Sequence, residues 1–371
     1  MAFSVLFTTP CVVPNTPNAQ RSLSFNAKSR ASGFRSISKR DFLSGAKALA
    51  LSSRRRFECR ADSIQIFCLK IAVAGGTGFV GSRLVRRLVA DGDEVIVLTR
   101  NVSKAQRSLP RGVTIVPYQP SQSGDWQSAV DGVDAVVNLA GASIAESRWT
   151  PERKREILES REETTKKIVE AIGKSKKKTP VLVNTSAIGF YGSSETLSYE
   201  EDSAPGKDFL AQVCTKWEAA AQAVTSYGTR LVILRFGIVL GEEGGALAKM
   251  IPIFKVFAGG PLGDGRQWFS WVHVDDLVDL IIWSIKNPGV QGVYNATAPN
   301  PVRMNTLCTA LGNSMSRPSW MPVPKFALEL LLGEGAQTVL EGQQVLPKRT
   351  LSSGFSFKYP TIDAAMKDII R

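Results

Sequence analysis

The stretch "KIAVAGGTGFVGSRLVRRLVADGDEVIVLTR" (Lys70–Arg100) decides the fold. Lys70–Ala74 is a short apolar run, which predicts a buried strand. Ser82–Ala90 repeats its apolar residues at helical spacing, and Val95–Leu98 is a second apolar run. Between the first strand and the helix, three glycines recur at three-residue spacing: Gly75, Gly78 and Gly81. The stretch therefore predicts one βαβ unit with a glycine-rich turn after its first strand.

This glycine turn has the form of a dinucleotide-binding site. Gly75 permits the tight turn, Gly78 lets the backbone approach a pyrophosphate, and Gly81 lets the helix pack against the strand. The helix N-terminus then offers free N–H groups and a positive dipole end to the phosphates. Because the turn follows a strand and opens a helix, we favour dinucleotide binding over a purely structural glycine turn.

The end of the second strand indicates which dinucleotide binds. A site for NAD usually has an acid there to hold the ribose 2′-hydroxyl. Here the strand ends in Thr99 and Arg100, and no acid occurs between Glu94 and Asp125. The charge and planar donor fork of an arginine suit a 2′-phosphate. NADP(H) is therefore predicted rather than NAD(H).

Strands and helices alternate through the next part of the chain. Further strands are predicted at Ala135–Leu139, Val181–Thr185 and Arg230–Phe236, and helices at Thr150–Gly173 and Leu210–Ser226. This alternation predicts an α/β fold, a doubly wound parallel Rossmann sheet with a smaller C-terminal α/β substrate lobe. We expect an NADP-binding domain at 63–240, completed by about 270–298, and the substrate lobe mainly at 241–371.

The first 62 residues differ in composition from the rest. Residues 1–60 contain ten serines and eleven of the 46 Lys and Arg residues, against only two acids, so much of the net charge of +13 belongs to them. This composition predicts a cleaved plastid transit peptide at 1–62, with a plain disordered tail or a twin-arginine signal as alternatives. We expect the mature protein in the stroma or on the stromal face of the inner envelope.

Composition also argues against several kinds of partner. The remaining positive charge is small and scattered, so no nucleic-acid partner is expected. The five cysteines include no CxxC pair, and His273 is the single histidine, so we expect neither a disulfide framework nor a metal site. No apolar run is long enough to span a bilayer, so any association with the envelope would be peripheral.

Longer motifs carry a family resemblance. "GGTGFVG", "NTSAIGFYG" and "WVHVDDL" resemble the extended short-chain dehydrogenase/reductase superfamily. "RWTPERKREILESR", "FLAQVCTKWEAAA" and "GGPLGDGRQWFSWVHVDDL" narrow the resemblance to an NAD-dependent-epimerase-like family labelled "SulA-like cell division inhibitor". It covers about residues 68–371. Plant members with transit peptides resemble the giant-chloroplast proteins, which are implicated in plastid division.

The resemblance implies a set of cofactor-binding positions in addition to the glycine turn. Carried over residue by residue, the set is Gly75, Gly76, Thr77, Gly78, Phe79, Val80, Gly81, Thr99, Arg100, Leu139, Ala140, Gly141, Glu156 and Arg161. Arg161 is physically reasonable as a second cation near the cofactor, and its alternative is a solvated helix arginine.

The resemblance also implies a Ser–Tyr–Lys catalytic set, from which this chain departs. Ser186 fits the serine and Lys216 the lysine, but Gln212 stands where the tyrosine is expected. An amide cannot act as the general acid that a phenol supplies. The substitute acids considered are Tyr191, Cys214 and Glu218, and the alternative role for Tyr191 is packing or contact with the substrate.

The remaining candidate residues lie in and after a loop that is rich in glycine and aromatic residues. Arg266 and Trp268 lie in "GGPLGDGRQWFSWVHVDD" (Gly259–Asp276), where a substrate could meet them. His273 is expected to be structural, and Asp275 and Asp276 to cap a helix that begins near Leu277.

Two functions follow from these observations. The first is an NADP(H)-dependent, epimerase-like oxidoreductase of the plastid, supported by Ser186 and Lys216, with an unknown small-molecule substrate. The second is an NADP(H)-binding regulator of chloroplast division with little or no turnover, in contact with plastid-division proteins.

Overall fold

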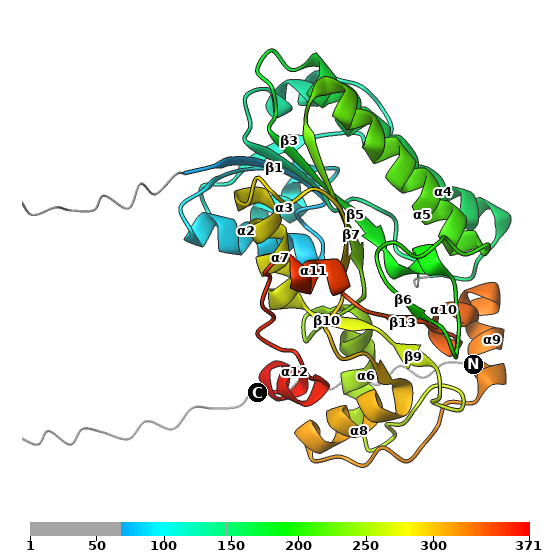
Figure 1. Ribbon diagram of the computed structural model, residues 1–371. Coiled ribbons are helices and arrows are strands. Elements are labelled where there is room, and N and C mark those ends of the chain that lie inside the picture. The colour runs from blue at the N-terminus through cyan, green and yellow to red at the C-terminus, as the bar shows by residue number, and fades with distance from the viewer. Residues whose placement is uncertain (1–67, 145–146) are drawn as a thin grey trace, which may run out of the picture. The chain divides into compact units, whose positions relative to one another are not determined.

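A parallel sheet organises the computed structural model, which describes residues 68–144 and 147–371 (Figure 1). Within these residues its seven strands lie in the order β11-β7-β5-β4-β1-β2-β3, and every pairing is parallel. The strands are β1 (Lys70–Ala74), β2 (Glu94–Thr99), β3 (Thr114–Pro117), β4 (Ala135–Asn138), β5 (Val181–Ala187), β7 (Arg230–Phe236) and β11 (Gly292–Ala296). The predicted α/β Rossmann class is confirmed. The predicted transit segment 1–62 lies outside the described residues.

Helices cover both faces of this sheet. Helices α2 (Phe79–Ala90) and α7 (Val274–Lys286) pack on one face, and α4 (Pro151–Lys174) and α5 (Phe209–Gln222) on the other. Because successive strand side chains point to opposite faces, each central strand feeds both cores. In β1, for example, Ile71 and Val73 belong to the first core, and Ala72 and Ala74 to the second.

The strand order places a switch point between β1 and β4. From β1 the chain builds outward through β2 and β3, returns to β4 on the other side of β1, and continues through β5 and β7. In open α/β sheets, ligands bind in the crevice outside the carboxyl ends of the strands at such a point. The glycine turn follows β1, and Leu139–Gly141 follow β4, so both lie at this crevice.

Residues after Gly241 form a further core and also return to the sheet. Helices α6 (Gly245–Lys255), α8 (Met304–Met315) and α12 (Ile362–Ile369) enclose an apolar cluster that includes Phe254 and Trp271. Short strands pair around it: β8 (Ile238–Gly241) with β10 (Trp271–His273), and β9 (Trp268–Phe269) with β12 (Val302–Arg303). A further short pair, β6 (Ser198–Tyr199) with β13 (Gln344–Val345), adjoins a separate apolar cluster that includes Tyr191 and Cys214. The remaining helices are α3 (Val102–Ser108), α9 (Lys325–Leu332), α10 (Gln337–Leu340), α11 (Lys348–Ser352), and the 3-10 turns η1 (Asp125–Val130), η2 (Ile188–Tyr191), η3 (Ala223–Tyr227) and η4 (Gly333–Ala336).

The edge strand β11 is capped by side chains from the C-terminal segment. Thr350 donates its hydroxyl to the carbonyl of Asn295 at 2.8 Å, and Arg349 donates to the carbonyl of Val293 at 2.9 Å. The Asn295 amide donates to the carbonyl of Leu346 at 3.0 Å, and its backbone N–H to Glu201 at 3.1 Å. Helix α11, drawn in red in Figure 1, carries Arg349 and Thr350 and lies against this edge strand.

One predicted cap is corrected by the structure. Helix α7 begins at Val274, and its N-cap is His273, whose Nδ1 accepts the backbone N–H of Asp275 at 3.1 Å. Asp275 instead binds Arg83 at 2.8 Å, and Asp276 accepts backbone N–H groups of the C-terminal segment. The prediction that the two aspartates cap the helix is wrong, because the helix starts three residues earlier than expected. The structural role predicted for His273 is confirmed by its cap bond.

Neither a membrane span nor a metal site is found among residues 68–144 and 147–371. No helix there has the length and apolarity needed to cross a bilayer. No group of three His, Cys, Asp or Glu side chains there is placed to hold a metal ion.

Candidate functional site

The glycine turn after β1 leaves no room for side chains. A Cβ on Gly81 would lie 2.2 Å from the carbonyl oxygen of Gly75, and one on Gly75, whose φ is 81°, would lie 2.7 Å from the carbonyl oxygen of Leu139. Helix α2 then starts at its N-cap Gly78 with no side-chain cap and no acid in its first turn. Its first N–H groups are therefore available to an anion, as a phosphate-binding helix requires. Phe79 packs against Gly244 and closes the turn from one side.

The end of β2 offers a cation and no acid. Thr99 is buried, and its hydroxyl oxygen accepts the backbone N–H of Asn101 at 3.1 Å. Arg100 is exposed and close enough to Tyr118 to oppose the burial that raises the pKa of that phenol to about 12. Asn101 caps α3 through the N–H of Lys104 at 2.8 Å. This end of the crevice suits a phosphate on the 2′ position of a ribose.

The segment after β4 lies against Arg161. A Cβ on Gly141 would be 3.1 Å from the guanidinium carbon of Arg161, which is partly buried on α4. The Nη1 of Arg161 donates to the carbonyl of Ile157 at 3.0 Å, and the guanidinium lies 5.3 Å from the ring centroid of Trp217. Burial lowers the pKa of Arg161, and no carboxylate of the described residues pairs with it. Glu156, in contrast, is exposed and paired with Arg153 at 2.5 Å.

The residues of helix α5 that face the sheet are not the ones that were expected. Gln212 and Lys216 are exposed, so the structure does not bring Lys216 to Ser186. The inward positions, also four residues apart, are held by Cys214 and Glu218. Ser186 is fully buried at the end of β5 and donates its hydroxyl to Glu218 at 2.6 Å. The expected set of Ser186 with Lys216 is therefore replaced by Ser186 with Glu218 and Cys214.

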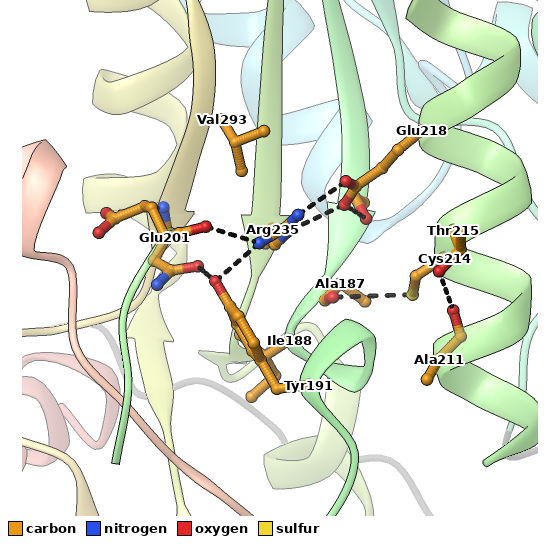
Figure 2. Close-up of polar contacts among 12 residues, drawn as sticks. Ala187, Ile188, Tyr191, Glu201, Ala211, Cys214, Thr215, Glu218, Arg235 and Val293 are labelled. Carbon is orange, nitrogen blue, oxygen red and sulfur yellow. Dashed lines mark hydrogen bonds and ion pairs between the residues drawn. The ribbon is translucent and has the colours of Figure 1, made fainter. Parts of the chain in front are cut away.

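Glu218 is held in a buried ion pair with Arg235 of β7. Two guanidinium nitrogens of Arg235 each donate to a different carboxylate oxygen of Glu218 at 2.8 Å (Figure 2). The guanidinium also lies 3.4 Å from the ring centroid of Phe190. Although burial alone would lower the pKa of Arg235, its bonds to Glu218 raise it above the ordinary value. This bidentate geometry, together with the bond from Ser186, leaves neither carboxylate oxygen of Glu218 free for a substrate.

The hydroxyl of Tyr191 donates one hydrogen bond and accepts another. It donates to Asn295 at 2.7 Å and accepts from Arg235 at 2.9 Å, and Figure 2 shows its hydroxyl pointing toward Arg235. The ring is buried and stacks on Tyr199 with centroids 5.3 Å apart. Burial raises its pKa. These contacts describe a packed structural tyrosine rather than a group open to substrate.

Cys214 is one of the residues considered as a substitute for the missing tyrosine. Its thiol is buried and lies 3.6 Å from the carbonyl oxygen of Ala187. Burial and the charge of Glu218 raise its pKa to about 11, with Arg161 acting in the opposite direction. The thiol is therefore protonated at neutral pH, but its closest partners are protein groups.

Arg266 and Trp268 contact Glu195, and Trp268 lies in β9. Arg266 is exposed and pairs with Glu195 at 3.3 Å, while the Trp268 indole donates to the Glu195 carbonyl at 2.9 Å. Arg303 lies over the Trp268 ring at 3.8 Å. Arg266 lines a pocket of about 280 Å³ together with Ser193, Ser194, Glu195, Asp264 and Gln267. Of the two predicted substrate residues, Arg266 lines this pocket and Trp268 does not.

Two residues of the site were not predicted from the sequence. Arg235 lies inside a strand, where nothing local indicates that its charge pairs with a helix. Trp217 reads as one more apolar residue of α5, and helical spacing alone does not reveal the arginine on its ring. The spacing of Ala211, Cys214, Glu218 and Ala221 could have predicted the inward face of α5, since these residues recur three and four apart and all are buried.

Comparisons with known proteins find relatives that match most of the chain. The NAD dependent epimerase/dehydratase family model matches residues 71–297, and a domain of unknown function (DUF1731) matches residues 323–369. The chain is 48% identical over 331 residues to "Epimerase family protein SDR39U1 homolog, chloroplastic" of Arabidopsis thaliana, covering 88% of this chain and 93% of the relative. It is 39% identical to "Epimerase family protein YfhF" of Bacillus subtilis, covering 81% of this chain and 98% of the relative.

A solved structure extends these matches. The crystal structure of human epimerase family protein SDR39U1 (isoform 2) with NADPH is 34% identical, has a TM-score of 0.73, and covers 81% of this chain and 99% of that chain. These relatives are named for an epimerase family and not for a cell-division inhibitor, so the narrower cell-division label is not supported. The fold, the glycine turn and the matches together show that this chain belongs to the NAD dependent epimerase/dehydratase family.

Proposed function

We propose that this protein is an NADP(H)-dependent, epimerase-like oxidoreductase of the plastid that acts on a small molecule. The observation that carries the proposal is the cofactor crevice. Its glycine turn excludes side chains, the end of β2 carries Arg100 and no acid, and Arg161 is partly buried without a carboxylate partner among the described residues. The similar human protein was solved with NADPH, which supports the same cofactor here.

The residues of the crevice fit NADP(H) in a consistent way. The N-terminus of α2 and the glycine turn would hold the pyrophosphate, and Arg100 the 2′-phosphate. When bound, NADPH supplies a hydride. The side chains around Ser186 would orient the reacting end and exclude water. Since Ser186 and Tyr191 are bonded to protein groups, the proposed substrate is one whose reduction needs no strong acid from this set.

The plastid assignment rests on two supports. One is the Ser- and Arg-rich composition of residues 1–62, and the other is the name of the Arabidopsis relative, which calls that protein chloroplastic. Within the plastid we propose the stroma or the stromal face of the inner envelope. An association with the envelope would be peripheral.

The proposal is tested by titrating the full chain with NADPH and with NADH. Nicotinamide fluorescence is followed for wild type, Arg100→Ala, and the control Arg107→Ala, an exposed arginine of α3. Loss of a charge-assisted bond of about 1.5–3 kcal/mol should weaken NADPH roughly 10- to 100-fold in Arg100→Ala and leave NADH unchanged. Equal affinity of wild type for the two nucleotides, or binding of neither, would contradict the proposal.

A second candidate is an NADP(H)-binding regulator with little or no turnover, acting through plastid-division proteins. The buried Glu218–Arg235 ion pair favours the regulator, because this pair occupies the position where an acid–base group is expected. Incubation of the NADPH-saturated protein with a panel of carbonyl and enone compounds separates the two. Consumption of NADPH supports the oxidoreductase, and tight binding without consumption, together with capture of division proteins, supports the regulator.

A further inference from the structure

Residues 333–342, called the strap below, consist mainly of η4 and α10 and lie between the C-terminal part and the start of α4. At the end of the strap, the carbonyl of Gly342 accepts the backbone N–H of Ser194 at 2.9 Å. The next residue, Gln343, donates its side-chain amide to the carbonyl of Ile188 at 2.9 Å. Ile188 follows β5 directly, so this end of the strap is fixed beside the carboxyl end of β5.

The beginning of the strap lies on the residues that lead into α4. Glu334 forms an ion pair with Lys154 of α4, and a Cβ on Gly335 would lie only 3.1 Å from the indole nitrogen of Trp149. Trp149 and Lys154 both contact the ring of Phe209 at the start of α5, at 5.3 Å and 5.4 Å from its centroid. Because β4 and β5 are neighbours, the strap spans the connections that follow two adjacent strands, at the edge of the sheet where ligands bind.

The strap forms one wall of two adjoining pockets. Three of its residues line the pocket of about 280 Å³ that contains Arg266. Six of its residues line a second pocket, of about 430 Å³. Asp264, Leu340 and Glu341 line both pockets, which shows that the two are continuous at this place. Movement of the strap therefore opens or closes the space around Arg266.

The first half of the strap is held by few contacts. Gly335 and Ala336 are the buried residues of the strap, and neither has a long side chain. The side chains of Lys154 and Glu334 are 30% and 63% exposed, and ion pairs as exposed as this one are weak. A segment with few buried apolar contacts and an exposed ion pair opens locally more easily than the core does.

The second half of the strap is anchored, and a glycine lies at each end. The side-chain amide of Gln267 donates to the carbonyl of Val339 at 2.9 Å. A Cβ on Gly342 would lie 1.9 Å from the carbonyl oxygen of Trp268, so the backbone is tightly packed there. Gly333, at the other end, has a φ of 58°, a conformation that favours glycine and suits a hinge. Opening therefore lifts the half that carries Glu334.

We propose that the strap is a gate over the two pockets, that the Glu334–Lys154 ion pair is its latch, and that the first half of the strap lifts to admit a small molecule. The inference rests on the proposed function, because it takes the pockets beside Arg266 as the place of a small-molecule substrate. It adds the route by which that molecule enters and the contact that controls entry.

Opening is measured with a thiol placed under the gate. Ala336 is 1% exposed and lines the second pocket, so in the full chain carrying Ala336→Cys the new thiol meets iodoacetamide when the gate opens. Labelling is followed by peptide mass spectrometry. Adding Lys154→Met or Glu334→Gln should speed labelling roughly 1.5- to 5-fold, because loss of the ion pair makes opening easier. The buried Cys308 is an internal control whose labelling rate should not change.

A second measurement needs no added thiol. Hydrogen exchange of peptides from residues 333–342 should accelerate in the otherwise wild-type chain with Lys154→Met or Glu334→Gln, while peptides from β1 and β4 exchange as before. The matched control is Lys166→Met, which removes an exposed lysine of the same helix that pairs with Glu162. Unchanged labelling and exchange in both latch variants, or equal acceleration by the control, would overturn the inference.

Exchanging the two charges shows whether the ion pair itself is the latch. Lys154→Glu and Glu334→Lys each place like charges together and should each speed labelling. The double variant restores an opposite pair and should label within about twofold of the wild-type latch. A double variant as fast as the single variants would overturn the role of the ion pair. These measurements are made without NADPH, so failure of wild type to bind NADPH, which would contradict the proposed function, is a separate result.

Discussion

Replacing Glu218 by glutamine should destabilise the protein strongly. Glu218→Gln keeps the size of the side chain but removes the charge that faces Arg235. The side chains of Arg235 and Glu218 are 5% and 11% exposed, so water cannot replace the lost partner. Removing one member of a buried ion pair typically costs about 3–5 kcal/mol, because the other charge stays buried without compensation.

The expected change in melting temperature follows from the size of the folded unit. Unfolding entropy is about 2.1 cal/mol/K per residue, or about 0.6 kcal/mol/K for a unit of roughly 300 residues. A loss of about 3–5 kcal/mol therefore lowers Tm by about 5–8 °C. Differential scanning calorimetry of wild type and Glu218→Gln measures this shift directly. Circular dichroism at about 20 °C checks that the variant is folded before heating.

The control is Glu162→Gln on α4, which breaks a more exposed pair with Lys166 at 2.8 Å. Surface pairs contribute about 0–1 kcal/mol, so this control should shift Tm by less than about 2 °C. A Glu218→Gln shift no larger than that of the control would refute the reasoning that the pair is buried and charged. Combining Glu218→Leu with Arg235→Met should give a protein more stable than Glu218→Leu alone, since no unpaired charge remains.

Three further predictions concern the turn, helix α5 and the buried thiol. Gly81→Ala should cost about 1–3 kcal/mol and weaken NADPH, because its Cβ would lie 2.2 Å from the Gly75 carbonyl oxygen, whereas Gly289→Ala, with nothing within 4 Å, should melt and bind like wild type. Lys216→Met should leave NADPH affinity within about twofold in the same titration, since Lys216 is exposed; a loss as large as that of Arg100→Ala would show that the lysine does contact the cofactor. Burial raises the pKa of Cys214 to about 11 from its ordinary 9.0, so the stability that comes from the protonated thiol is present below about pH 9 and is lost as pH rises toward 11. Above pH 9, the free energy of unfolding should therefore fall more steeply in wild type than in Cys214→Ala, by about 1.4 kcal/mol per pH unit, and parallel slopes would contradict the assigned pKa.

Local signals explain why the first part of the fold was predicted well. The strand Lys70–Ala74 and the strand Arg230–Phe236 have the predicted bounds, because each is an apolar run between polar or turn-forming residues. The glycine turn was also predicted, since the need for glycine arises within one short run of consecutive residues. Helix α4 begins where Thr150 and Pro151 indicate, as a cap residue followed by proline in the first turn.

The register of α5 was not predicted, for a physical reason. A lysine at a family position predicts a catalytic role only if that face of the helix meets the sheet. Which face meets the sheet depends on packing against β5 and α4, and these contacts are distant in sequence. Lys216 faces outward while Glu218, two residues later, meets Ser186. The Glu218–Arg235 pair spans two elements and leaves no pattern in either one.

The capping of β11 by Glu201, Arg349 and Thr350 has a consequence for how the chain acquires its structure. Synthesis delivers the chain from its N-terminal side, so Arg349 and Thr350 emerge after all seven strands of the described sheet. Until then the outer edge of β11 has backbone groups without partners, which invites pairing with another chain. Capping of the sheet edge must therefore wait for Arg349 and Thr350, and a chain truncated before them should be held by chaperones or aggregate.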